Sequence, residues 1–370
     1  MQWMGRPTQA IIDLQALRNN FEYARSKAPD SNFVAVLKAN ACGHGLERAG
    51  KTLSMMTEAF GVACIEEAIA LRRASIQNPI LLMEGIFTQD EVKIASENNF
   101  WMLVENDFQL NSLISSKLSQ PVKVFFGIDT GMHRLGFQTK DFLSKFEILQ
   151  SSVNVKKPIV ISTHFSCADD LDSDFTALQI NQFDEYINKN NLTTSSYEQS
   201  LSNSAGLLGW PNSRRQWQRP GYMLYGNSPF LQPHEADQRL EPAMDFKSKI
   251  ISLRNIPAGA SVGYGRNWLA DRETKIATVT VGYADGYPRN ARNGTPILVK
   301  GKLCPLVGRV SMDMITIDVT DLNEVSIGDD VLLWGKGLSV NRVAKYCNSI
   351  GWELLARITA RVPRHYVDQI

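Results

Sequence analysis

The feature that most constrains the fold is an alternation, between residues 11 and 230, of short apolar runs with longer segments whose apolar residues recur every three or four positions. Short runs bounded by turn residues indicate strands, and the longer periodicity indicates amphipathic helices. Such an alternation is typical of proteins with a parallel sheet covered by helices. The pattern predicts eight strands, namely Phe33–Lys38, Gly61–Cys64, Ile80–Met83, Trp101–Val104, Val122–Ile128, Ile159–Thr163, Gln199–Asn203 and Arg219–Gly221.

Two of the intervening segments show clear helical faces. Over Thr139–Ser151 the apolar residues share one face and Thr139 is expected to cap the N-terminus, and a second helix is predicted over Asp172–Asn190. Eight strands with helices between them over roughly 200 to 250 residues match the size of a closed barrel, although an open doubly wound sheet gives a similar pattern. We therefore predict an N-terminal (β/α)8 barrel of the TIM type.

The pattern changes after Pro233, where strand-like runs follow one another without long helices between them. Only Ser339–Asn348 is predicted to be helical in this part. Because 370 residues suit two domains, we place the barrel in residues 1–232 and a mainly β domain in residues 233–370. The predicted strands of the second domain are Met244–Leu253, Lys275–Gly282, Thr295–Val299, Met312–Asp318 and Asp330–Trp334.

Composition excludes several classes of function. The 39 Lys and Arg residues nearly balance 38 Asp and Glu residues, so no net charge indicates nucleic acid or an acidic membrane as a partner. The five cysteines form no C-x-x-C pair, which argues against a disulfide framework and a zinc site. Residues 1–8 contain no signal-peptide core, and no apolar stretch approaches the ~18 residues of a membrane helix. We expect a cytoplasmic protein with a small-molecule partner and no metal site.

Polar residues follow several predicted strands, where a barrel carries its catalytic face. Lys38 ends the first strand, Arg134 follows the fifth, His164 ends the sixth and Arg219 begins the eighth. A partly desolvated lysine amine is available as a nucleophile for a Schiff base, although a lysine whose stem simply leaves the core is the alternative interpretation.

A second group follows the seventh and eighth strands, where barrels often bind phosphate. It consists of Ser204, preceded by Asn203, and the backbone N–H groups of Gly221 and Tyr222. A strand-end lysine together with a phosphate site suggests pyridoxal 5'-phosphate as cofactor.

Several motifs resemble those of the alanine racemase family, and they span both domains in family order from about residue 10 to Arg364. As a set they are highly specific. They are Ala35–Gly45 (AVLKANACGHG), Asp129–Phe137 (DTGMHRLGF), Ser202–Gly206 (SNSAG), Arg219–Gly226 (RPGYMLYG), Val262–Gly265 (VGYG), Gly282–Tyr287 (GYADGY) and Gly308–Asp313 (GRVSMD).

The resemblance implies a racemase in which Lys38 binds pyridoxal 5'-phosphate covalently and then acts as one catalytic base. Tyr264 resembles the second base, which in this family comes from the partner subunit of a head-to-tail homodimer. Removing a proton from one face of a carbon and returning one to the other requires two differently placed groups. In the family, His164 links this tyrosine to Arg219, which faces the pyridine nitrogen of the cofactor.

The resemblance also implies which residues bind the ligands. Arg134 resembles the family's arginine at the substrate carboxylate and the cofactor. Met312, followed by Asp313, would offer its backbone N–H from the partner subunit, and Tyr283 resembles an entrance residue. The cofactor set implied is Lys38, Arg134, Asn203, Ser204, Arg219, Gly221, Tyr222 and Trp352. D-Alanine as product implies peptidoglycan supply in a bacterial cytoplasm.

Three positions depart from the family pattern. Gly127 stands where most members carry a carbamylated lysine whose negative charge orients the Arg134 equivalent. A chloride ion near Arg134 or a nearby carboxylate is expected to replace that charge. Cys42 and Trp352 replace two tyrosines that contact the cofactor phosphate, and a thiol is a weak donor. Cys42 is either a reactive thiol or a buried, inert one.

Alternative functions remain open at this point. The family also contains racemases of other or several amino acids. An amino-acid decarboxylase of the same architecture is disfavoured because the chain has no Gly-Gly pair and because Cys304 is followed by Pro305 rather than an acidic residue. A non-catalytic cofactor-binding protein is the third alternative, although such proteins usually have the barrel alone.

Overall fold

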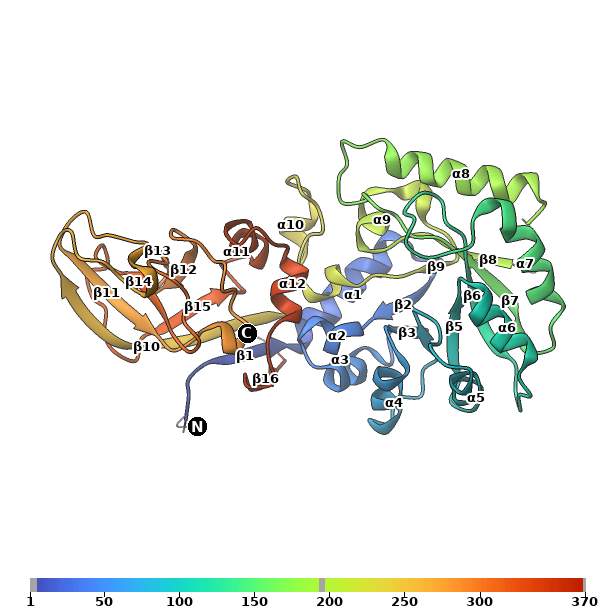
Figure 1. Ribbon diagram of the computed structural model, residues 1–370, viewed down its shortest axis with the longest axis horizontal. Helices are drawn as coiled ribbons and strands as arrows, with labels where there is room; N and C mark the ends of the chain where they lie inside the picture. Colours follow the sequence, from blue (N-terminus) through green and yellow to red (C-terminus); the bar gives the residue numbers. More distant parts are fainter. Residues whose placement is uncertain (1–4, 193–196, 369–370) are drawn as a thin grey trace.

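The structure is a computed structural model that describes residues 5–192 and 197–368, and it forms two lobes (Figure 1). Residues 1–4 belong to the stretch in which we expected no signal peptide, and they lie outside the described residues. Within the described ranges, no helix combines the length and the apolar character needed to cross a bilayer. One lobe is a parallel barrel, and the other is a mainly β domain.

The barrel strands lie in the order β8-β7-β6-β5-β4-β3-β2-β9. The backbone N–H of Arg219 donates to the carbonyl of Ser202 at 3.0 Å, and Ser200 Oγ donates to the carbonyl of Trp217 at 2.9 Å, so β9 joins β8. This closure confirms the predicted barrel and excludes the open sheet. The strands are β2 (Asn32–Val36), β3 (Ala59–Val62), β4 (Ile80–Leu82), β5 (Phe100–Val104), β6 (Val122–Gly127), β7 (Val155–Ser162), β8 (Tyr197–Ser200) and β9 (Trp217–Gln218).

The barrel interior contains a layer of buried apolar side chains. Trp101 and Trp217 meet there edge to face, with ring centroids 5.2 Å apart. Because side chains alternate along a strand, every second residue of a barrel strand faces this interior. The layer consists of Val34, Ala59, Leu81, Trp101, Phe125, Val160 and Trp217.

Helices cover the outside of the barrel, as predicted. The helix α7 spans the predicted Thr139–Ser151, but the proposed cap was wrong: Gln138 occupies the N-cap and no side chain caps this helix. The second predicted helix is shorter than expected and spans Phe175–Lys189 (α8). The others are α1 (Leu14–Lys27), α2 (Lys38–Cys42), α3 (Leu46–Leu53), α4 (Ile65–Arg73), α5 (Asp90–Glu97), α6 (Asp107–Ser115) and α9 (Ser204–Gly209).

The second lobe contains the predicted strands and several that the sequence did not reveal. A second helix follows the predicted one, so the prediction of a single helix was wrong, while Ser339 caps α11 by accepting from the N–H of Asn341. The helices are α10 (Ala236–Arg239), α11 (Val340–Tyr346) and α12 (Gly351–Ala356). The strands are β10 (Met244–Ile256), β11 (Thr274–Val279), β12 (Pro296–Val299), β13 (Lys302–Pro305), β14 (Ile315–Asp318), β15 (Asp330–Trp334) and β16 (Arg364–Val367).

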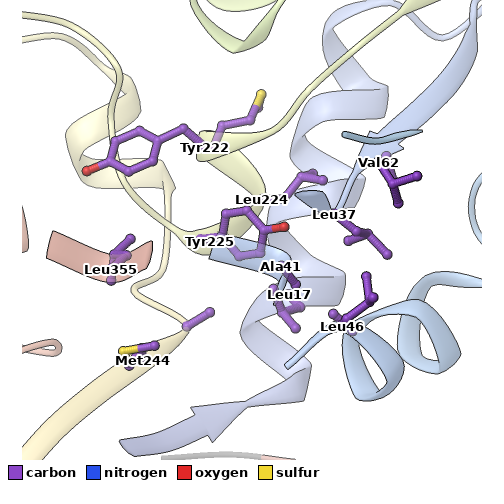
Figure 2. Packing of buried hydrophobic residues seen from close by; sticks show 14 of the residues in the cluster. Leu17, Leu37, Ala41, Leu46, Val62, Tyr222, Leu224, Tyr225, Met244 and Leu355 are labelled. Atoms are coloured by element: carbon purple, nitrogen blue, oxygen red, sulfur yellow. The ribbon is translucent and has the colours of Figure 1, made fainter. Parts of the chain in front are cut away.

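The N-terminal strand β1 (Gln9–Asp13) joins the second sheet, where it pairs with β10 and β16. The division at residue 232 stays a prediction, but the first strand of the chain lies with the β domain. Buried residues of both lobes form one continuous cluster at the junction, where Tyr225 lies between Leu37 on one side and Leu355 and Met244 on the other (Figure 2). The two lobes therefore share a core.

Candidate active site

Lys38 lies just beyond β2, at the end of the barrel where the strands finish. It begins the turn α2, in which Ala39, Asn40 and Ala41 have φ values of 56°, 55° and 53°. Successive residues with side chains rarely adopt this left-handed conformation, because the β carbon crowds the backbone. The turn therefore needs surrounding contacts that hold it in place.

Two residues that the sequence did not single out supply those contacts. Glu67 on α4 accepts from the N–H of Ala39 at 2.8 Å and from that of Ala63 at 3.0 Å. The Nδ1 atom of His44 lies 3.1 Å from the carbonyl of Ala41 and 3.0 Å from that of Cys42, so it must carry the proton and donate. The position of His44 between two glycines was the available signal, whereas nothing marked Glu67.

His44 is held neutral by its surroundings. Its side chain is fully buried and stacks on Tyr225 with ring centroids 4.6 Å apart. Burial lowers the pKa of His44 to about 4. The phenol of Tyr225 in turn donates to the carbonyl of Val36 at 2.8 Å, at the end of β2. The chain on both sides of Lys38 is therefore anchored in the core.

The lysine itself is exposed in the single chain. We expected a partly desolvated amine, and this expectation is wrong for one chain alone, because the strand ends at Val36 and Lys38 is carried past the barrel core.

A buried arginine lies at the centre of the rim. Arg219 is 6% exposed and donates to Ser200 Oγ and to the carbonyls of Thr163 and Leu201. Burial lowers its pKa to about 10, so it keeps its charge at neutral pH. These bonds use both terminal nitrogens and leave Nε without a partner among the described residues.

His164 lies within the influence of several cations. Burial, followed by the positive charges of Arg219, Arg134 and Lys38, lowers the pKa of His164 to about 3. Because their charges act on His164, Lys38, Arg134 and Arg219 lie in the same region of the rim as this histidine. A neutral imidazole next to a charged guanidinium can accept or relay a hydrogen bond without adding charge.

A group of hydrogen-bond donors lies beside the rim at Ser204. Its hydroxyl oxygen accepts from the N–H of Gly221 at 2.9 Å and from that of Met223 at 3.3 Å. A β carbon on Gly221 would lie 3.4 Å from Val36 Cβ, which is an ordinary van der Waals contact. Convergent N–H and hydroxyl groups suit a phosphate, and the residues present therefore fit pyridoxal phosphate.

We call Ser204 and the backbone N–H groups beside it the phosphate cradle. The other predicted cofactor residues lie next to it. The ring of Tyr222 stacks on Trp352 with centroids 3.6 Å apart, and its hydroxyl donates to Asn341 at 2.6 Å. Asn203 uses its side chain to cap α9 by accepting from the N–H of Gly206 at 2.9 Å. Burial raises the pKa of the Cys42 thiol to about 12, which favours the interpretation of an inert cysteine.

Of the five site residues predicted in the β domain, Trp352 reaches the barrel of its own chain, whereas the other four are not found beside Lys38. Tyr264 follows β10, whose 13 residues carry the chain roughly 40 Å away from the junction. Figure 1 shows β10 and β11 extending away from the barrel. The Tyr264 side chain is 71% exposed and that of Met312 is 53% exposed.

The remaining two of these residues lie close to Met312. Tyr283 donates its N–H to the carbonyl of Ser311 at 3.1 Å, and the carboxylate of Asp313 lies 2.6 Å from Arg361. Tyr283, Met312 and Asp313 therefore lie together in one region of the β domain.

The fold and the site together define a barrel enzyme whose rim carries a lysine, a buried arginine and a serine bonded to two backbone N–H groups. Comparison with known proteins makes the family specific. The family model described as "Alanine racemase, N-terminal domain" matches residues 12–229, and "Alanine racemase, C-terminal domain" matches residues 243–366. The chain belongs to the alanine racemase family, and the predicted enzyme class, an amino-acid isomerase, is confirmed.

Relatives match over nearly the whole chain. The alanine racemase of Xanthomonas campestris pv. campestris is 44% identical, with 98% of each chain covered. The catabolic alanine racemase of Pseudomonas putida is 43% identical over 98% of this chain and 100% of its own. The chain is thus similar in length and sequence to whole members of the family.

Solved structures agree with this assignment. The biosynthetic alanine racemase of Pseudomonas aeruginosa has a TM-score of 0.94 and 41% identity, covering 98% of this chain and 100% of its own. The alanine racemase of Bartonella henselae, solved with covalently bound pyridoxal phosphate, has a TM-score of 0.87 and 26% identity over the same shares.

Proposed function

We propose that this protein is a pyridoxal-phosphate-dependent racemase that interconverts L-alanine and D-alanine by a two-base mechanism. The observation that carries the proposal is the gathering of Lys38, His164 and Arg219 beside the Ser204 cradle at one rim of the barrel. Membership of the alanine racemase family supports alanine as the substrate.

The cofactor would be held by groups that the rim already presents. Lys38 would bind it covalently, and the hydroxyl of Ser204 with the N–H groups of Gly221 and Tyr222 would hold its phosphate. When bound, pyridoxal phosphate withdraws electrons and acidifies the α C–H bond of an amino acid. Arg219, which keeps its proton, would face the pyridine nitrogen and leave that nitrogen unprotonated.

Two residues would exchange the α-proton from opposite faces. Lys38 Nζ would take or return it on one face, and the Tyr264 oxygen on the other. Because Tyr264 of the same chain is remote from Lys38, it would come from the partner subunit of a head-to-tail homodimer. The positive charge of Arg219, reaching the tyrosine through His164, would favour a phenolate that can act as a base.

The substrate carboxylate would be bound by Arg134 and the backbone N–H of the partner's Met312. Tyr283 and Asp313 would border the entrance from the same β domain. A charge opposite to that of Arg134 would come either from a chloride ion or from a nearby carboxylate.

The biological role follows from the product. D-Alanine supply for peptidoglycan in the bacterial cytoplasm is the role that we propose. All five cysteines carry free thiols, which is consistent with a reducing compartment.

The direct test is proton NMR of the purified protein with pyridoxal phosphate and L-alanine in deuterated water, followed by chiral analysis. We expect the α-proton signal to disappear while D-alanine forms, and both changes to be absent in Lys38→Ala. Cofactor binding without α-proton exchange for alanine or for a panel of other amino acids would contradict a racemase.

A further inference from the structure

We propose that Glu105 is the anion that positions Arg134 for the substrate carboxylate. This inference rests on the proposed function, because it concerns the binding of the substrate at the same rim. Glu105 is a positioning residue in this account, since it acts through Arg134 rather than on the substrate.

Glu105 stands at the mouth of the barrel. It directly follows β5, and Val104 of β5 pairs with Phe126 of β6. Trp101 faces the barrel interior, so the alternation of side chains places Glu105 on the same face four residues later. By the same reasoning Gly127, two residues after the interior Phe125, faces the mouth beside Glu105.

Gly127 has no side chain, and the side chain of Glu105 lies where one would extend. A β carbon at residue 127 would lie 3.3 Å from Glu105 Cβ and 3.4 Å from Gly136 Cα, closer than most such contacts. A larger side chain at this position would compete with Glu105. The glycine and the glutamate are therefore a matched pair on neighbouring strands.

The carboxylate of Glu105 reaches the loop that carries Arg134. Its Oε2 atom accepts from the N–H of Gly136 at 3.2 Å, and Oε1 accepts from Asn106 Nδ2 at 2.6 Å. Gly136 lies two residues after Arg134 and has a φ of 107°, where a β carbon would approach the Asp129 nitrogen at 2.8 Å. Only glycine presents its N–H to Glu105 in this way.

The loop is short and closed at its base. The N–H of Asp129 donates to the carbonyl of Phe137 at 3.0 Å, and the N–H of Phe137 donates to that of Gly127 at 2.9 Å. Asp129 also accepts from the N–H groups of Gly131 and His133. The backbone on both sides of Arg134 is fixed, while its side chain remains exposed.

Two opposite charges in this region lack a counterion. Among the described residues, no Lys, Arg or His nitrogen lies within 4.0 Å of the Glu105 carboxylate, and Arg134 forms no ion pair. Glu105 is half-buried, so an unpaired charge is costly there. A planar guanidinium has donors enough for Glu105 and a substrate carboxylate together. With Glu105 in this place, no chloride ion is required.

The test compares Glu105→Gln with Glu105→Asp in the holoenzyme. The glutamine keeps an acceptor for Gly136 but removes the charge, whereas the aspartate keeps the charge. We expect Glu105→Gln to raise KM for alanine about tenfold while kcat changes less than about threefold. Glu105→Asp should raise KM for alanine much less than Glu105→Gln does. Glu97→Gln, which removes an exposed charge on α5, is the matched control and should leave both constants unchanged.

A binding measurement without turnover accompanies the kinetics. Propionate is alanine without its amino group, and its Kd by calorimetry should rise about tenfold in Glu105→Gln. Unchanged KM and propionate affinity in Glu105→Gln, or equal losses in both variants, would overturn the proposal. So would a wild-type rate that falls when chloride is replaced by gluconate. Failure of the wild type to exchange the α-proton would instead contradict the proposed function.

Discussion

The barrel rim and the β-domain surface carry two halves of one proposed site, and they are built differently. At the rim, Arg219 and Ser204 are 6% and 5% exposed, whereas Tyr264 and Met312 are 71% and 53% exposed on the β domain. The arginine and the serine of the first half are packed within their own chain, whereas Lys38 and Arg134 beside them are exposed. The residues of the second half lie on a surface. This difference is what the proposed site, shared between two chains, would require.

Exposure of the second half does not imply that it is loosely held. Buried Asp285 accepts from the N–H of Gly282 at 2.8 Å and from Arg6, which also donates to the carbonyl of Asp313 at 2.8 Å. Arg361 bridges to the carboxylate of Asp313 at 2.6 Å. These bonds fix the turns that carry Tyr283 and Met312, so the surface is ordered before it meets a partner.

The largest loss of activity is expected for a substitution in the barrel half of the site. Lys38→Ala should lower kcat about a thousandfold or more, because the nucleophile and one base are lost together. Since Lys38 is exposed, Tm should change little. Initial rates and thermal unfolding check both statements. Lys51→Ala, an exposed lysine on α3, serves as the control. A rate within tenfold of wild type would remove Lys38 from its proposed role.

A change in the β-domain half of the site should lower the rate of α-proton exchange by different amounts for the two enantiomers of alanine. Tyr264→Phe is expected to lower kcat by about a hundredfold, the scale of a lost general base. Exchange of the α-proton in deuterated water should slow strongly for one enantiomer only, because Lys38 still serves the other face. Tyr346→Phe, on α11, should leave both rates unchanged. Equal slowing of both enantiomers would argue against a two-base scheme.

Stability should respond to acid through His44, which supports the lysine turn. The ordinary pKa of histidine is near 6.5, and the folded value is about 4, so the unfolded chain binds more protons between these pH values. Stability is therefore full above pH 6.5 and is lost as pH falls toward 4, with His44 accounting for about 3 kcal/mol of the loss.

Urea unfolding at pH 7 and at pH 4.5 measures this contribution. The fall in unfolding free energy should be smaller in His44→Gln than in wild type, whatever the variant's stability at pH 7. An identical fall in both proteins would show that His44 does not titrate on unfolding.

A smaller effect is expected at the phosphate cradle. Ser204→Ala should weaken the binding of pyridoxal phosphate about tenfold, which corresponds to one hydrogen bond to a charged group. Titration of cofactor-free protein gives this constant. Ser144→Ala, on the exposed face of α7, is the control. Unchanged affinity would place the phosphate elsewhere on the rim.

Local sequence patterns predicted most of the barrel. Apolar periodicity located seven of the eight barrel strands, whereas the predicted Arg219–Gly221 lies just after the observed β9 (Trp217–Gln218) and was wrong. The rule that strand ends carry the catalytic face located Lys38, His164 and Arg219. The N-terminal strand β1 was missed because its pairing with β10 and β16 joins residues more than 200 positions apart. Periodicity carries no information about such distant pairing.

The residues that support the site were harder to predict. The left-handed turn after Lys38 runs through Ala39, Asn40 and Ala41, and the two alanines have no preference for it, so tertiary contacts override local propensity. Glu67 and Glu105 act through backbone N–H groups of distant loops. Only the folded chain shows which loop each carboxylate reaches.

The central claim is that each site combines the barrel of one chain with the β domain of another. Lys38→Ala and Tyr264→Phe are each expected to keep about a hundredth or less of the wild-type activity alone, and the two variants can be mixed under conditions that exchange subunits. Random pairing makes half of the dimers mixed, each with one intact site, so the account predicts about a quarter of the wild-type racemase activity. A mixture no more active than its separate components, despite proven exchange of subunits, would contradict it.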